Sequence, residues 1–141
     1  MARLLWAVLC RRIIVDQPTG AISYIDALEG IGSAHYPAPA PPIIAGTLWL
    51  REGEDEHRLE VKVSILSPEE VLIVADSAVV ELEKSHRRAR IHIGFGGFQI
   101  QGPGQHFVLI EVKDGKRWKE HSRIPFDVEM IPAQQGTANQ H

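Results

Sequence analysis

Histidine is the residue type in this chain with the most versatile chemistry, because it ligates metals and transfers protons near neutral pH. The chain has seven histidines among 141 residues. No two of them form a His-x-His pair, and no spacing between them is typical of a zinc site. We therefore expect surface histidines and no metal or other cofactor. The seven are His35, His57, His86, His92, His106, His121 and His141.

One segment leaves an enzymatic alternative open. Residues 97–106 resemble the second metal motif of the cupins, in which a Gly-Pro turn precedes a histidine on a strand. The resemblance is limited to this stretch, because the other cupin motif, a His-x-His pair with a downstream Glu, is missing. The alternative hypothesis is therefore a small metal-dependent, cupin-like enzyme that uses His92 and His106 on adjacent strands.

No other residue type is arranged for catalysis. The serines lack the Gly-x-Ser-x-Gly turn that exposes a nucleophile, and the aspartates lack the Asp-x-Asp loops that bind calcium in C2 sandwiches. Cys10 is the single cysteine and lies in an apolar run, where we interpret it as a core residue, with a reactive thiol as the alternative. We expect no catalytic, cofactor-binding or metal-binding residues, and so a protein that is not an enzyme.

The charge of the chain excludes one class of partner. Lysine and arginine number 15 against 18 aspartates and glutamates, which gives a net charge of −3 with neutral histidines. Nucleic-acid binding generally needs a basic face that displaces counterions, so we expect no nucleic acid. The one basic cluster contains His86, Arg87, Arg88 and Arg90. We interpret it as the solvated start of a strand, with a phosphate-binding patch as the alternative.

The length of the chain fits one domain. We expect this domain over residues 1–131 and a flexible, polar C-terminal tail over residues 132–141. The apolar run Leu4–Cys10 is short for a signal peptide, and Arg11 and Arg12 follow it at once. No stretch approaches the ~18 apolar residues that span a bilayer. These features predict a soluble, cytoplasmic protein without membrane contact.

Hydrophobic residues recur with the period of two that is typical of β-strands. From Arg58 to Ile65, odd-numbered residues are apolar and even-numbered residues are polar, and residues 88–95 alternate in the same way. The same rule predicts a long last strand from Trp118 to Met130, with an edge or bulge at Pro125. The residues expected on one face of that strand are Trp118, Ile124, Phe126, Val128 and Met130.

Turn residues separate these segments. The Pro and Gly of residues 16–20 predict a hairpin between Leu4–Val15 and Ala21–Ile31, with a bulge or register change near Asp26. A second hairpin turn is expected at Asp114-Gly115.

Two segments allow more than one interpretation. Ser67–Glu70 resembles a helix start, but the β-branched residues that follow favour a turn and a strand, with a short helix as the alternative. The proline-rich Pro37–Pro42 is interpreted as a stiff crossover between two sheets, with a ligand for an aromatic-lined groove as the alternative. The whole pattern predicts an all-β, antiparallel two-sheet sandwich, immunoglobulin-like or C2-like, with about eight strands and at most one short helix.

Two regions also resemble a known group of proteins. Residues 6–26 carry a hairpin of the form cysteine, apolar strand, Asp, Thr-Gly, Ser and apolar strand. Residues 103–115 and 124–128 carry Pro-Gly, an alternating strand, Asp-Gly, Pro and a last apolar strand. Both are similar to the first and last hairpins of an uncharacterised bacterial family of small β-sandwich proteins, a domain of unknown function. The resemblance implies the fold and a bacterial origin, and it implies no activity.

These observations favour a non-enzymatic binding or assembly module that acts through protein–protein contacts. Sandwich edges can accept a strand from a partner or from a second copy. Apolar residues on both faces of Leu4–Val15 indicate a surface that another molecule covers. We therefore expect a protein partner or a homo-oligomer.

Overall fold

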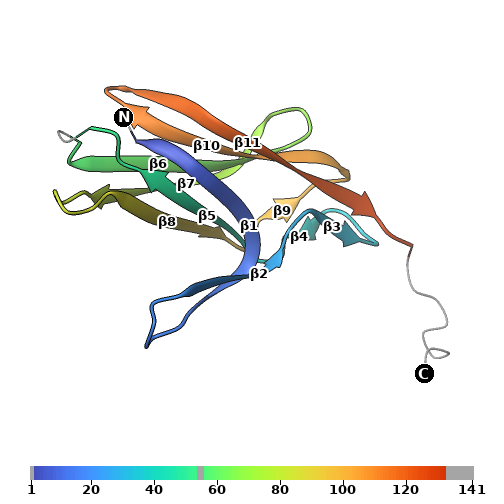
Figure 1. Cartoon of the computed structure of the whole chain (residues 1–141). Coiled ribbons are helices and arrows are strands. Elements are labelled where there is room, and N and C mark those ends of the chain that lie inside the picture. The colour runs from blue at the N-terminus through green and yellow to red at the C-terminus, as the bar shows by residue number, and fades with distance from the viewer. Residues whose placement is uncertain (1, 54–55, 133–141) are drawn as a thin grey trace.

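The computed structural model describes residues 2–53 and 56–132, and all regular elements in this part are β-strands. The main strands form two layers (Figure 1). The described residues contain no helix that could cross a membrane. The strands are β1 (Arg3–Val15), β2 (Ile22–Ala27), β3 (Gly30–Ser33), β4 (Ala38–Pro39), β5 (Ile43–Leu50), β6 (Arg58–Leu66), β7 (Leu72–Glu81), β8 (Arg88–Phe95), β9 (Gln99–Ile100), β10 (Gly104–Asp114) and β11 (Arg117–Met130).

Sheet A has the strand order β2-β1-β5-β8, and sheet B has the order β3-β11-β10-β6-β7. Strands β4 and β9 form a small third sheet. All pairings are antiparallel except that of β3 with β11, which is parallel. The fold is therefore an all-β sandwich, as the alternation predicted. The additional strands beyond the expected eight are short segments such as β4 and β9, which have two residues each and no room for a hydrophobic period.

One hydrophobic core lies between sheets A and B. Trp49 of β5 and Phe126 of β11 are among its largest fully buried side chains. In β6 the four apolar residues from Leu59 to Ile65 are buried, which confirms the predicted strand. Ser64 was expected on the wet face but is also buried; it is a small residue on an inner strand, between Leu109 of β10 and Ala75 of β7.

The first hairpin projects from the sandwich. Residues 3–10 of β1 pair with β5, Cys10 pairs with both β5 and β2, and Arg12–Val15 pair only with β2. The two-stranded ribbon of residues 11–26, which we call the arm, leaves the body of the molecule (Figure 1). At its end Asp26 has a left-handed φ of 58°, and β3 then joins sheet B. The hairpin is confirmed. The register change expected near Asp26 is wrong, because β1 and β2 keep one register from Cys10↔Ala27 to Val15↔Ile22, and the irregularity at Asp26 is limited to its left-handed backbone.

The two ambiguous segments also have clear structures. The chain passes from β3 in sheet B to β5 in sheet A through Pro37–Pro42, which confirms the predicted crossover. Ser67–Glu70 forms a turn: the Glu70 amide donates to the Ser67 carbonyl (2.8 Å), and the Val71 amide donates to Ser67 Oγ (3.1 Å). Strand β7 follows, so no helix forms here.

The predicted face of β11 is wrong at its two ends. Ile110 pairs with Ser122 and the next residue of β10 pairs with Glu120, so His121 is a bulge residue. The bulge turns Trp118 to the outer face, where Lys62 Nζ lies 4.6 Å from the ring centroid. At the other end Met130 is exposed. Of the expected tail, 132–141, all residues after Pro132 lie outside the described part of the chain.

Candidate functional site

His92 and His106 do not come together. His92 lies on β8 of sheet A, and His106 lies on β10 of sheet B. The expectation that they occupy adjacent strands is wrong, because β8 pairs with β5 and β10 pairs with β6 and β11. Within residues 2–53 and 56–132, no group of three or more His, Cys, Asp or Glu residues is placed to hold a metal. The cupin-like site therefore lacks its geometric basis.

His92 belongs instead to a cluster on the outer face of sheet A. Tyr24 of the arm lies over Gly46, and its hydroxyl is 3.0 Å from His92 Nε2. Arg90 Nη1 donates to the same hydroxyl oxygen (3.4 Å). The rings of Trp6 and Tyr24 make an edge-to-face contact at 5.4 Å. We call Trp6, Tyr24, Arg90 and His92 the outer-face cluster.

The outer-face cluster is arranged around a neutral histidine. Partial desolvation of the ring lowers the pKa of His92, and the positive charge of Arg90 lowers it further. A neutral ring leaves a lone pair on Nε2 that the Tyr24 hydroxyl can donate to, while its oxygen accepts from Arg90. The arm is thus fastened to sheet A by an ordered chain of hydrogen bonds.

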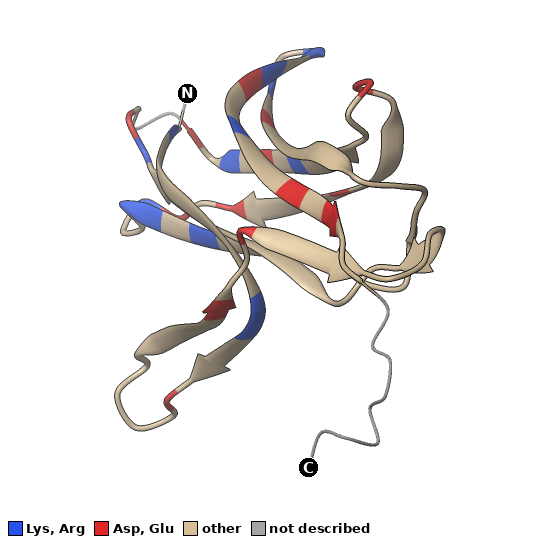
Figure 2. Cartoon of the chain, turned by 90° about the vertical axis from the view of Figure 1, so that its right-hand side faces the viewer, with Lys and Arg blue, Asp and Glu red and all other residues tan. Residues whose placement is uncertain are grey.

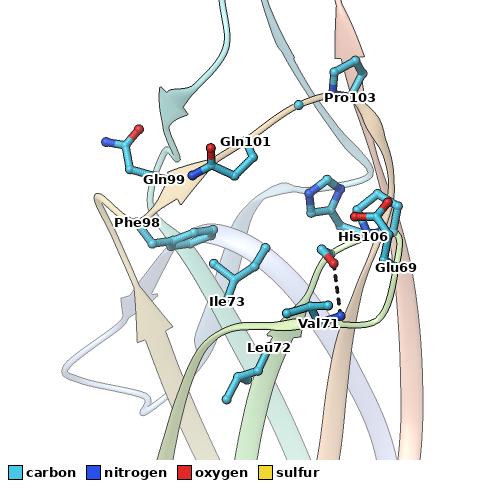
Figure 3. Close-up of a pocket in the computed structure, with 12 residues that line it drawn as sticks. Glu69, Val71, Leu72, Ile73, Phe98, Gln99, Gln101, Pro103 and His106 are labelled. Carbon is cyan, nitrogen blue, oxygen red and sulfur yellow. Dashed lines mark hydrogen bonds between the residues drawn. The ribbon is translucent and has the colours of Figure 1, made fainter.

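His106 lies in the wall of a pocket of about 740 Å³ at the end of the sandwich (Figure 3). The pocket lies between the turn that precedes β7 and the segment around β9. Val71, Leu72, Ile73 and Phe98 give it an apolar side, and Gln99 and Gln101 give it two amides. The remaining lining residues are Ser67, Pro68, Glu69, Gly102 and Pro103.

His106 is a structural part of this wall. The residue is only 2% exposed, and its ring centroid lies 5.4 Å from that of Phe126. Nδ1 is 3.1 Å from the Gly104 carbonyl oxygen, so this nitrogen carries the donated hydrogen. Gly104 has φ of +136°, and a Cβ there would lie 2.6 Å from Pro68. Glycine is therefore required for the close packing that shapes this end of the pocket.

The pocket opens beside a free sheet edge. β7 is the last strand of sheet B, and no other strand in the described ranges pairs with its second edge. Ile73 is a bulge residue, because Leu72 pairs with Leu66 and Val74 with Ile65. From Val74 to Glu81 the strand is regular. A partner strand could therefore pair with regularly spaced backbone N–H and C=O groups that begin directly after the pocket.

The remaining predicted residues have mixed outcomes. Cys10 is fully buried, as predicted, but it lies on the outer face of sheet A and outside the core between the sheets; burial raises the pKa of its thiol. The basic cluster at residues 86–90 is exposed apart from Ala89, and both signs of charge are scattered over the described strands (Figure 2).

His121 and His106 were expected at the surface, and both expectations are wrong. The β11 bulge turns His121 inward against Trp49, with the ring centroids 5.5 Å apart. Burial lowers the pKa of His121, and the charge of Lys119 lowers it further. The sequence signal for His106 was its place on the buried parity of an alternating strand.

Comparison with known proteins finds similarity among solved structures. No protein-family model matches the chain, and no curated protein matches it. A solved structure from Pseudomonas aeruginosa, described as an immunoglobulin-like protein, is similar over 92% of this chain and 97% of that chain, with 11% identity and a TM-score of 0.40. The two-sheet architecture agrees with the small β-sandwich fold that the resemblance noted in the sequence implied.

Proposed function

We propose that the domain is a non-enzymatic module that binds an extended segment of another protein as an added strand on β7. The observation that carries the proposal is the unprotected edge of β7 beside the apolar pocket. In such complexes the backbone hydrogen bonds supply affinity, and pockets for side chains supply specificity.

β7 is the longest sheet-edge strand that lacks Lys, Arg and Pro; β2 also lacks these residues, but it has only six residues. Proteins commonly protect edge strands with Lys, Arg or Pro, or by making them short. β8 carries Arg88 and Arg90, the unpaired side of β11 carries Pro125, and β3 has four residues. β7 has ten residues and contains no Lys, Arg or Pro. An edge of this length without such protection favours a strand partner.

The pocket fits an apolar side chain of the partner. Val71 and Leu72 are 62% and 58% exposed, which is high for apolar residues next to a hollow. A bound apolar group would remove both from water, and burial of apolar surface contributes roughly 25 cal/mol per Å². Gln99 and Gln101 are placed to hydrogen-bond the backbone that carries this group (Figure 3).

The charges on β7 favour a basic strand. Asp76 and Glu81 are the only charged residues of β7. Both are exposed, and neither makes an ion pair with another described residue. Oppositely charged residues on neighbouring strands attract each other, so a Lys or Arg beside Asp76 would strengthen the pairing.

The test is selection of peptides from a random phage-displayed library, followed by hydrogen exchange of the backbone amides with a selected peptide. We expect slower exchange in β7 and weaker binding by about tenfold or more in Val71→Asp, because a carboxylate would be buried against an apolar group. The control is Val15→Asp on the arm, because Val15 is 53% exposed and Val71 is 62% exposed. This variant is expected to bind the peptide as tightly as wild type does.

Two results would overturn the proposal. One is protection of amides in another strand but not in β7. The other is light scattering that shows a stable dimer which Val71→Asp dissociates, because a second copy would then be the occupant of the edge.

A further inference from the structure

The outer face of sheet A carries a second, chemically different surface. Residues paired across neighbouring strands point to the same face, so the registers of β1, β5 and β8 define rows of side chains. Ala45, Thr47 and Trp49 of β5 are buried towards the core, so the residues between them point outward. The outward rows are Arg3-Leu50-Arg88, Trp6-Leu48-Arg90, Val8-Gly46-His92 and Cys10-Ile44-Gly94.

The centre of this face is aromatic and already ordered. Trp6 is 37% exposed, and Leu48, its partner on β5, is buried. The Arg90 guanidinium lies 5.9 Å from the centroid of the Trp6 ring and donates a hydrogen bond to Tyr24. Trp, Tyr and Arg are the residues that most often dominate the energetics of protein interfaces. Their fixed positions here reduce the entropy that a partner's binding would cost.

The rim of this face is basic. Arg3, Arg88 and Arg90 are its only formally charged residues, and the four rows contain no Asp or Glu. None of the three makes a salt bridge with another residue of the described ranges. Protection of the β8 edge does not account for all three arginines, because Arg3 lies on the inner strand β1 and the Arg90 guanidinium also lies over the Trp6 ring.

We infer that this face binds an acidic segment of a partner protein, with the carboxylates on Arg3, Arg88 and Arg90 and an apolar side chain against Trp6. Arginine pairs with carboxylates through two parallel hydrogen bonds, and the free donors of Arg88 and Arg90 suit this geometry. A nucleic acid fits less well, because three arginines displace few counterions and the chain as a whole is negative. The surface is separate from β7 and its pocket.

The experiment uses two matched phage libraries, one with Asp or Glu at alternate positions and one with Asn or Gln at the same positions. We expect peptides to be enriched only from the acidic library. A selected peptide should bind Arg90→Gln about tenfold more weakly and Arg88→Gln several-fold more weakly, and salt should weaken its binding to wild type. Arg88 is exposed, so its variant tests the inference even if Arg90→Gln perturbs the fold.

Two controls separate this surface from others. Arg58→Gln removes an arginine whose side chain is 60% exposed on β6, and Val71→Asp alters the pocket beside β7. Both variants should bind the acidic peptide normally. The acidic-peptide surface can therefore be refuted while strand binding at β7 holds, and strand binding at β7 can be refuted while the acidic-peptide surface holds. Equal enrichment from the neutral library, or an equal loss in Arg58→Gln, would overturn the inference of an acidic-peptide surface. Tighter binding of single-stranded RNA through Arg90 would also overturn it.

Discussion

Gly46→Ala should release the arm from sheet A. A Cβ at Gly46 would lie 2.6 Å from Tyr24 Cε1, which is too close for two carbon atoms, and 3.2 Å from Cδ1, which is tighter than an ordinary contact. The ring cannot move aside without losing its partners, because Trp6 packs against it and His92 bonds its hydroxyl. A single methyl group therefore forces Tyr24 off the sheet.

The expected cost follows from the contacts that Tyr24 makes. Its hydrogen bond to His92 is worth about 1 kcal/mol, and its edge-to-face contacts with Trp6 and His92 are worth about 0.5–1.5 kcal/mol each. Replacing glycine within a strand returns about 0.5–1 kcal/mol, because alanine loses less backbone entropy on folding. The net loss of unfolding free energy should be about 1–3 kcal/mol.

A double-mutant cycle in urea separates this mechanism from general damage to β5. In a Tyr24→Ala background the ring is absent, so Gly46→Ala should be neutral or stabilising. The same destabilisation in both backgrounds would show that the added methyl acts on β5 itself, and the inferred fastening of the arm by Tyr24 would be wrong.

Three further results are expected. The lowered pKa values of His92 and His121 mean that the folded protein binds these protons less readily than the unfolded chain, so stability should fall as pH drops through the ordinary value of 6.5. Urea titrations at several pH values should show that the free energy of unfolding falls less with decreasing pH in His92→Gln than in wild type. An equal pH dependence in the two proteins would contradict the lowered pKa of His92. Cys10 should resist iodoacetamide in the native protein at neutral pH, since burial raises its pKa, and labelling at the unfolded rate would refute this. Thr47→Val should cost about 1–3 kcal/mol, because Thr47 Oγ1 accepts from buried Trp49 Nε1 at 2.8 Å, while Thr47→Ser should cost less. Equal losses of unfolding free energy in urea would contradict this role of the hydroxyl.

The strands could be predicted where one face meets the core and the other meets water. In β8, Ile91 and Ile93 are buried while Arg88, Arg90 and His92 are exposed, which is the alternation visible in the sequence. The prediction failed at Trp118 because a one-residue bulge reverses the parity of a strand. The bulge at His121 has no Gly or Pro to mark it.

The candidate surfaces could not be predicted, because they depend on the order of strands in each sheet. Proximity in the sequence placed His92 and His106 together, but the chain changes sheets between β8 and β10. The same limit applies to β7, whose residues predicted a strand without showing that one edge would be unpaired. Local pattern determines which face of a strand is buried, and only long-range pairing determines what lies beside it.

The two faces of β1 show how local hydrophobic pattern and long-range strand pairing act together. Apolar residues on both sides of Leu4–Val15 indicated that another molecule covers this strand. In the structure the chain covers part of it: Leu9 is buried in the core, and Cys10 is buried on the opposite face, where the arm begins. What stays open on that face is Trp6 at the centre of a basic rim. An apolar strand that is only partly covered by its own chain is the physical reason to look for a partner at this position.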